Sequence, residues 1–498
     1  MAFSSAGSGR DTARVLLFGV LILIGAFFIS QGIARVRMEM AFALALAFGV
    51  FILVFMRTEA GLYFVLLSML LSPELSVGGG DLSEGRQGLV LRLEDLLLMV
   101  IGVSWFAKMS MNKEAGLTVK TALNRPIVAY IAVTAMATVL GYLTGSVQSA
   151  GGFFYVLKYV EYFVVYYMTI NHLRDRSQMW RLVMTALVTA AIVSVVGIAQ
   201  IPSGQRVTAP FEGEVGEPNT FGGYLLLMMG VAAGIALETR RAKFRLLGVA
   251  FIGLAALPFA FTLSRASYLG VIPLVIGLAL LSSQRRFMVG ILLLMIPLAP
   301  IVGAKVVPTA VKNRLAETFR PEAAQVTVKI GGVEFDPSTS ERLVAMRKAV
   351  RGWIRRPVLG YGVTGFAYMD AQYARTLVET GLVGFVTFGW LIWVVVKSGV
   401  TTLRVAKSAE ERGLALGFVA GTLGLLGHAF GSNTFIIVRI MEPFWFFAAV
   451  VAALPMLPEV AAPPPSPPQR LPGFVPRAPV APPRLPAPVG GRRAGRPF

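Results

Sequence analysis

The residues with the most evident chemistry are arginines spaced along one predicted helix. Ser338 opens a capping-box pattern, which predicts where the helix begins, and Pro357 predicts where it ends. Between them Arg347, Arg351 and Arg355 recur every four residues and therefore share one helix face. A guanidinium is a planar, permanently charged group that fits phosphate oxygens. This row predicts contact with an anionic ligand; the alternative is an amphipathic helix lying on anionic lipid headgroups.

The same region carries apolar and glycine patterns. Residues 326–335 alternate apolar side chains around Gly331-Gly332, which predicts a small hairpin. The predicted helix has an apolar face of its own, made of Leu343, Met346, Val350, Trp353 and Ile354. Residues 360–365 match the dinucleotide pattern G-x-G-x-x-G, but no βαβ unit surrounds them, so we reject nucleotide binding. We expect these glycines to turn the backbone tightly beside the membrane.

Two further ionisable residues lie near the ends of apolar runs, where charge is costly and therefore informative. Arg265 has no acidic neighbour in the sequence, so it is either an anion-binding residue or an anchor that reaches lipid headgroups. His428 is one of 2 histidines and is either a hydrogen-bonded packing residue or part of a site. The chain has no cysteine and no Asp/His cluster with metal-ligand spacing, so we predict neither a metal site nor another cofactor.

Membrane-spanning helices must position these residues. The chain has 498 residues, of which 55% are hydrophobic and 14% are charged. Globular chains are about 45–50% apolar and about 25% charged. The excess apolar surface excludes a soluble enzyme, a secreted disulfide scaffold and a disordered protein. It predicts an all-α polytopic membrane protein, in which the net charge of +20 serves first to orient the spans.

Uncharged apolar runs of about 17–22 residues predict about 14 transmembrane helices, within a range of about 12–14. They lie near 15–33, 40–56, 60–72, 93–107, 126–145, 153–171, 182–200, 219–237, 246–262, 266–282, 287–303, 374–396, 413–431 and 435–454. Basic connections alternate along the chain, which predicts that both termini lie on the inner side.

These spans divide the chain into four predicted parts. Residues 1–303 form an N-terminal bundle, 304–373 one long periplasmic loop with the amphipathic arginine helix, and 374–454 the C-terminal helices. Residues 455–498 are rich in proline and arginine and predict a disordered cytoplasmic tail. The long loop carries 11 Lys and Arg against 6 Asp and Glu between Lys305 and Asp370, although the charge rule does not require a basic loop on that side.

Five segments surround the long loop in a definite order. They are 206–219 with its Arg206 and Pro218-Asn219, 262–266 (Thr-Leu-Ser-Arg-Ala), 341–346, 356–366 and 373–384. In this order they resemble the O-antigen polymerase and O-antigen ligase superfamily, multi-span bacterial enzymes that act on undecaprenyl-diphosphate-linked glycans. Its members commonly show an arginine helix, then hPLLGxGxxxF, then YLxxLxExGxxG. The resemblance runs from about residue 206 to 396, and the earlier spans match only in hydropathy.

The resemblance implies a GT-C-like glycosyltransferase architecture in the bacterial inner membrane, with an active site facing the periplasm. Ligases of the family carry a histidine where this chain has Asp370, which favours a polymerase. The resemblance implies catalytic roles for Arg265, Asp370 and Arg342. Contacts with the diphosphate or the glycan are implied for Arg206, Asn219, Arg347, Arg351 and His428. The general base is Asp370, His428 or neither.

Three functions remain open at this point. The favoured one is a polymerase that joins undecaprenyl-diphosphate-linked repeats while arginines stabilise the leaving diphosphate. The second is a ligase that transfers finished glycan to lipid A-core or protein. The third is a lipid-linked oligosaccharide flippase, although the chain shows no convincing internal repeat. Expected partners are the lipid-linked glycans, the lipid bilayer, and a chain-length regulator and a flippase of the same pathway; no nucleic acid is expected.

Overall fold

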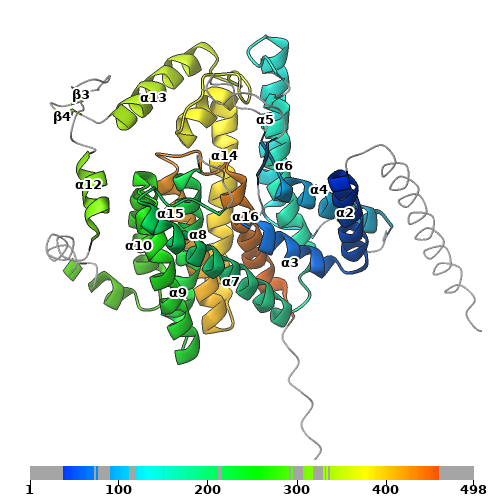
Figure 1. Cartoon of the computed structure of the whole chain (residues 1–498), viewed down its shortest axis with the longest axis vertical. Coiled ribbons are helices and arrows are strands. Elements are labelled where there is room, and N and C mark those ends of the chain that lie inside the picture. Colours follow the sequence, from blue (N-terminus) through cyan, green and yellow to red (C-terminus); the bar gives the residue numbers. More distant parts are fainter. Residues whose placement is uncertain are drawn as a thin grey trace, which may run out of the picture. The chain divides into compact units, whose positions relative to one another are not determined.

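The structure of the protein is a computed structural model in which helices predominate (Figure 1). It describes residues 38–71, 74–76, 90–111, 119–149, 151–210, 216–290, 293–294, 307–317, 329–330, 333–334 and 337–458. The described residues belong to one compact unit that ends at Pro458. The predicted first span, most of the span predicted at 287–303 and nearly all of the predicted C-terminal tail lie outside the described residues.

Helices follow one another along most of the described chain. The first are α2 (Met38–Met56), α3 (Thr58–Ser68), α4 (Leu93–Met111), α5 (Asn124–Leu143), α6 (Gly151–His172), α7 (Arg176–Gln200) and α8 (Pro218–Glu238). The next are α9 (Ala242–Phe261), α10 (Arg265–Leu281), α12 (Thr309–Glu317), α13 (Pro337–Arg355), α14 (Gln372–Val405), α15 (Ala409–His428) and α16 (Val438–Ala453). Two short antiparallel pairs join β1 (Glu74–Ser76) to β2 (Val90–Arg92) and β3 (Lys329–Ile330) to β4 (Val333–Glu334).

The predicted spans coincide with helices wherever the structure describes them. Each span predicted between residues 40 and 282, and between 374 and 454, lies on one of the helices α2 to α10 or α14 to α16. Six helices in the described ranges are long and apolar enough to cross a membrane: α5, α7 with the 3-10 turn that follows it, α8, α9, α14 and α16 with its following turn. Shorter apolar segments lie in α2, α3, α4 and α10. A multi-pass membrane protein is thereby supported, whereas the total of 14 crossings stays a prediction.

Both predictions for secondary structure in the long loop are confirmed. Ile330 of β3 lies opposite Val333 of β4, as expected for a hairpin that turns between them. Helix α13 begins at Pro337 and ends at Arg355, just before Pro357. The loop also contains α12, which the apolar periodicity did not indicate because its mean composition is polar.

Helix α8 packs against α15 through glycines at the centre of the bundle. A Cβ atom on Gly230 would meet the Gly417 carbonyl oxygen at 3.2 Å, and one on Gly417 would meet the Gly230 carbonyl oxygen at 2.5 Å. Two backbones can approach this closely only without side chains between them, which is how small residues join helices within a membrane. The close packing fixes the ends of α8 and α15, where several of the predicted site residues lie.

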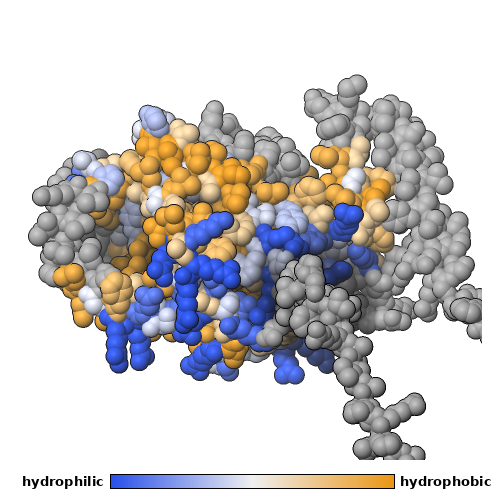
Figure 2. All heavy atoms as spheres, turned by 90° about the horizontal axis from the view of Figure 1, so that it is seen from below, coloured by the Kyte–Doolittle hydropathy of each residue, from blue (hydrophilic) through white to orange (hydrophobic). Residues whose placement is uncertain are grey.

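Polar contacts between distant segments gather at two ends of the helices. At one end, which we call the α13 end, Arg356 donates to the Ser146 hydroxyl at 2.6 Å and so ties the long loop to the end of α5. At the opposite end, Arg176 of α7 pairs with Glu411 of α15 at 2.9 Å. Figure 2 views the opposite end and shows hydrophilic residues gathered beside a hydrophobic area. Connections predicted to share one side of the membrane therefore meet one another in the structure.

Candidate active site

Helix α14 is interrupted at Gly381, where φ is 66° and ψ is −168°. A break leaves backbone groups without their helical partners, and at membrane depth these must find others. The N–H groups of Tyr361 and Gly362 donate to the carbonyl oxygens of Val378 and Glu379 at 3.0 and 2.7 Å. The loop that follows α13 thus takes the place of the missing helical turn.

The same loop also accepts hydrogen bonds from the second half of α14. The Leu382 N–H donates to the Pro357 carbonyl oxygen at 2.8 Å, and the Val383 N–H to that of Val358 at 3.2 Å. Gly360 and Gly362 have φ values of 67° and 86°, a region that favours glycine. The expectation that the glycines of residues 360–365 turn the backbone is confirmed. Their turn holds the segment that leads to Asp370 against α14.

Arg206 is fixed by the connection between α9 and α10. Its Nε donates to the Thr262 carbonyl oxygen at 3.0 Å, and its Nη2 to that of Leu263 at 3.3 Å. Leu263 has a φ of 50°, a left-handed conformation that is uncommon for residues other than glycine. Within the described part of the chain these carbonyl groups are the hydrogen-bond acceptors of Arg206, so its positive charge meets dipoles and no carboxylate.

Arg265 begins helix α10 beside two other helices. Ser264 is the N-cap of α10, and its hydroxyl donates to Asn219 Oδ1 at 2.7 Å near the start of α8. Arg265 Nη1 donates to the Thr339 hydroxyl of α13 at 3.3 Å. The structure therefore places Asn219 beside Ser264, the residue before Arg265, at the α13 end.

Arg342 of α13 reaches the segment before α14. Its Nη2 lies 3.4 Å from Asp370 Oδ2, a long distance for a charged pair, and both side chains are about three-quarters buried. Asp370 Oδ1 accepts a hydrogen bond from the Asn433 N–H at 3.1 Å, and Asn433 Nδ2 donates to the Met369 carbonyl oxygen at 2.8 Å. Asp370 is consequently held by the connection between α15 and α16 and contacted by Arg342 of α13.

Three other arginines lie near enough for their charges to act on Arg206, and we call the four the arginine cluster: Arg206, Arg265, Arg314 and Arg342. Burial, and then the positive charges of Arg314, Arg342 and Arg265, lower the pKa of Arg206 to about 10. A guanidinium stays protonated in a protein near neutral pH. The lowered pKa therefore expresses the free-energy cost of gathering positive charge in a half-buried place. A bound anion would relieve that cost.

Burial raises the pKa of the Asp370 carboxyl above its ordinary value, while Arg342, the Asn433 N–H and Arg375 oppose that rise. A carboxylate whose pKa is raised is a better proton acceptor at neutral pH than an ordinary aspartate. No group of three or more His, Asp or Glu side chains that could hold a metal ion occurs among the described residues. Around Asp370 the structure therefore shows a largely buried carboxylate beside the guanidinium of Arg342.

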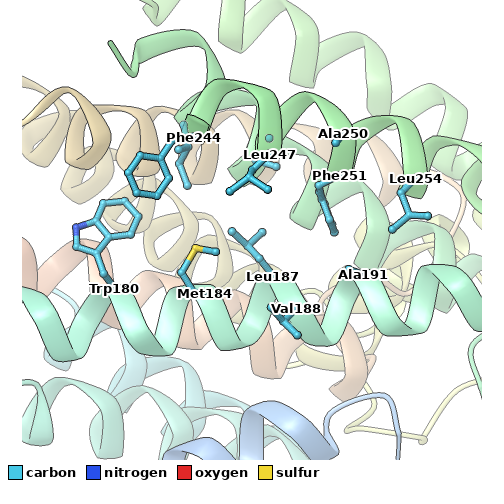
Figure 3. Close-up of a pocket in the computed structure, with 13 residues that line it drawn as sticks. Trp180, Met184, Leu187, Val188, Ala191, Phe244, Leu247, Ala250, Phe251 and Leu254 are labelled. Atoms are coloured by element: carbon cyan, nitrogen blue, oxygen red, sulfur yellow. The ribbon is translucent and has the colours of Figure 1, made fainter. Parts of the chain in front are cut away.

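A cavity of about 310 Å³ is lined by sequence neighbours of Asp370 and Arg342, although neither of these two side chains lines it. It lies between α13 and residues 366–369, and its lining includes Glu341, Lys348, Phe366 and Tyr368. Aromatic rings beside charged and polar groups suit a sugar, which presents both apolar and hydroxyl faces. A second cavity, of about 280 Å³ between α7 and α9, differs in character because apolar side chains such as Trp180, Met184 and Phe244 line it (Figure 3).

Three of the predicted site residues form no hydrogen bond or ion pair with the arginine cluster in the described part of the chain. Arg347 and Arg351 are exposed on α13, and neither forms an ion pair with a carboxylate among the described residues. His428 is fully buried: its Nδ1 lies 2.7 Å from the Thr434 hydroxyl, and its ring packs against Gly223 of α8. A ring with no exposed surface touches no substrate in this conformation, which favours its interpretation as a packing residue.

The packed face of α13 differs from the predicted apolar face. Ala345, Ala349 and Gly352 face α14 and the loop, whereas Val350 and Ile354 are 45% and 65% exposed. The reason is steric, because a Cβ atom on Gly352 would meet the Phe366 ring at 2.7 Å. The exposed apolar residues accompany Arg347 and Arg351, an arrangement that suits the lipid-headgroup alternative for these two arginines.

Two ionisable features were absent from the sequence-based set of candidates. Arg314 of α12 joins the arginine cluster and pairs with the exposed Glu317 at 3.0 Å. Arg375 and Glu379 form a buried ion pair at 3.1 Å in α14, and Glu379 also accepts from the Thr364 N–H. The spacing of four residues between Arg375 and Glu379 could have predicted this pair, because such residues share a helix face. It fastens α14 to the glycine-rich loop.

The fold and site define a polytopic helical membrane protein with a cationic site at the α13 end. Residues 250–389 match the family described as O-antigen ligase, a segment that includes Arg265, Arg314, Arg342 and Asp370. The match supports membership of the O-antigen polymerase and O-antigen ligase superfamily, and it does not separate polymerases from ligases. No curated protein matches the chain.

Proposed function

We propose that the protein is a glycan polymerase of the bacterial inner membrane. In this proposal it joins undecaprenyl-diphosphate-linked oligosaccharide repeats of an O-antigen, capsule or exopolysaccharide, and the α13 end faces the periplasm. One observation carries the proposal: the arginine cluster concentrates positive charge next to Asp370, a carboxylate with a raised pKa. The superfamily match over residues 250–389 supports the reaction class.

The reaction exchanges one bond to the anomeric carbon of the donor glycan for another. A hydroxyl of the acceptor repeat forms the new glycosidic bond as the bond to the lipid diphosphate breaks. The diphosphate leaves with the bonding electron pair, so negative charge grows on its oxygens. Preorganised guanidiniums stabilise such charge more in the transition state than in the ground state. Arg206 suits this task because carbonyl groups already fix its orientation.

The acceptor hydroxyl loses its proton to Asp370 in this proposal. The carboxylate is held by the Asn433 N–H and lies beside Arg342, whose positive charge favours the ionised form. In this proposal the acceptor sugar occupies the cavity of about 310 Å³ between α13 and residues 366–369. Because diphosphate is a good leaving group, orientation of the two substrates contributes alongside proton transfer.

The competing function is a ligase that transfers finished glycan to lipid A-core or protein, which the description of the matched family favours. Glycans from a deletion strain separate the two functions. Loss of long chains with single repeats still attached indicates a polymerase. Loss of all attachment, with lipid-linked polymer accumulating, indicates a ligase and rejects our proposal. Lipid-linked repeats that accumulate on the cytoplasmic face indicate a flippase and reject both.

The site itself is tested by Arg265→Ala in the complemented deletion strain. We expect the long-chain glycan ladder to disappear, with protein abundance unchanged on an immunoblot. Arg355→Ala provides a matched control, because Arg355 is an exposed arginine of α13 outside the arginine cluster. A normal ladder in Arg265→Ala at normal abundance would remove Arg265 from the mechanism.

A further inference from the structure

A second concentration of positive charge lies at the opposite end of the helices. A cavity of about 340 Å³ is enclosed by the α2–α3 junction and the ends of α4 and α6, together with the start of α7. Its lining includes four basic residues, Arg57, Lys108, His172 and Arg174, and one acidic residue, Glu59. We call it the basic pocket.

The acidic residue of the basic pocket is already engaged elsewhere. Glu59 Oε1 pairs with Arg181 at 3.3 Å, and the Tyr63 hydroxyl donates to the same oxygen at 3.3 Å. Arg57 and Arg174 are exposed, and neither pairs with a carboxylate anywhere in the described ranges. The side chains that line the cavity therefore carry a net positive charge.

Lys108 is oriented by neutral groups. Its Nζ donates to the Thr58 hydroxyl at 3.0 Å and lies 3.4 Å from the Met56 carbonyl oxygen. An ammonium has three donors, so these contacts fix its direction and leave capacity for a further acceptor. His172 Nδ1 lies 2.9 Å from the Met168 carbonyl oxygen, which orients the other ring nitrogen away from that carbonyl.

This combination of groups suits a phosphate. Guanidiniums and an ammonium at several sides of one cavity match the several oxygens of a phosphate group. The first turn of α3 also lines the cavity through Thr58, Glu59 and Ala60, and no side chain caps that helix start. Its N–H groups add a favourable dipole to the charge of the basic residues.

Apolar surface leads away from the basic pocket along two helices. Met56 lines the cavity and is 65% exposed, and Phe106, on the last turns of α4 before Lys108, is 60% exposed. Helices α2 and α4 pack against each other, and both expose further apolar side chains, such as Leu53 of α2 and Val103 of α4. A free phosphate needs no such apolar surface, whereas the acyl chains of a phospholipid do.

We propose that the basic pocket binds the phosphate of an anionic phospholipid whose acyl chains lie along α2 and α4. This site lies at the end opposite the arginine cluster, so it is independent of the proposed polymerase site. It would anchor the part of the bundle formed by α2, α3 and α4 to the lipid headgroups.

Native mass spectrometry of the full-length protein in detergent tests this proposal with added phosphatidylglycerol and phosphatidylcholine. We expect wild-type protein to bind phosphatidylglycerol preferentially. The variant K108Q/R174Q should bind it about tenfold more weakly, as expected for loss of charge-assisted hydrogen bonds. The matched control R285Q/R286Q removes the same charge from exposed arginines outside the basic pocket and should bind like wild type.

Several outcomes would overturn the proposal. Equal weakening in K108Q/R174Q and R285Q/R286Q would indicate diffuse attraction between the basic surface and the lipid. Equal binding of the two lipids by wild-type protein would show that the headgroup charge is not recognised. Binding of inorganic phosphate without a preference for phosphatidylglycerol would assign the cavity to a free anion. R57Q, which changes only an exposed residue, repeats the test should K108Q/R174Q fail to fold, and it should also weaken phosphatidylglycerol binding.

Discussion

Arg176 and Arg412 at one end of the helical bundle and Arg206 at the other are held in opposite ways. At the opposite end, Arg176 pairs with Glu411 at 2.9 Å and Arg412 with Glu238 at 3.1 Å, so charge is matched by charge. At the α13 end, Arg206 is held by backbone carbonyl groups. An arginine that pairs with a carboxylate joins two helices, whereas an arginine held only by carbonyl groups can direct its positive charge toward an anionic ligand. The partner of an arginine is therefore a better guide to its role than its position in the sequence.

The largest effect is expected from Arg342→Ala at the α13 end. Loss of a guanidinium that stabilises the leaving group should lower polymerising activity by about 100-fold or more. The pair with Asp370 is long for an ion pair, at 3.4 Å, so its loss should change Tm little. The measurements are glycan formation from purified lipid-linked repeats and thermal unfolding. A large fall in Tm with normal activity of the folded fraction would place Arg342 among the structural arginines.

The next effect concerns stability at the opposite end. Glu411→Ala leaves the guanidinium of Arg176 without its carboxylate in a largely buried place. We expect the free energy of unfolding to fall by about 1.5–3 kcal/mol, the range for hydrogen bonds to charged groups. Activity per folded molecule should stay unchanged. A loss of activity without a loss of stability contradicts the contrast between the two ends.

The smallest effect is a shift in pH dependence. Because burial raises the pKa of Asp370, its carboxylate is protonated at a higher pH than an ordinary aspartate. Activity should therefore disappear, as pH falls, at a higher pH than an unperturbed aspartate would give. Arg342 opposes the rise, so Arg342→Ala should move this acidic limit further up. Full activity of Asp370→Asn would show that Asp370 is not the base.

Local patterns predicted local structure well. The capping box at Ser338 and the stop at Pro357 correspond to the bounds of α13, and Gly331-Gly332 lies between the strands of the predicted hairpin. Apolar runs located the helices because length and composition alone decide whether a segment spans a bilayer.

Contacts between segments were harder to predict. We predicted the packed face of α13 from its large apolar residues. The helix instead packs through Ala349 and Gly352, because it approaches the loop too closely for larger side chains. The break at Gly381 was not predicted, because the residues that replace its hydrogen bonds lie before it in a separate loop. Arg314 was missed because nothing in the sequence of α12 indicates that it folds back toward Arg206.

The broken helix α14 has a consequence for what supports the site. The segment before Asp370 is tied by hydrogen bonds to both halves of α14, and Asp370 itself is tied to Asn433. Helix α13 meets this frame through small side chains such as Ala349. Arg342 and Asp370 are therefore supported by different elements. Their separation of 3.4 Å depends on the position of α13, whereas the position of Asp370 depends on the hydrogen bonds to α14 and Asn433.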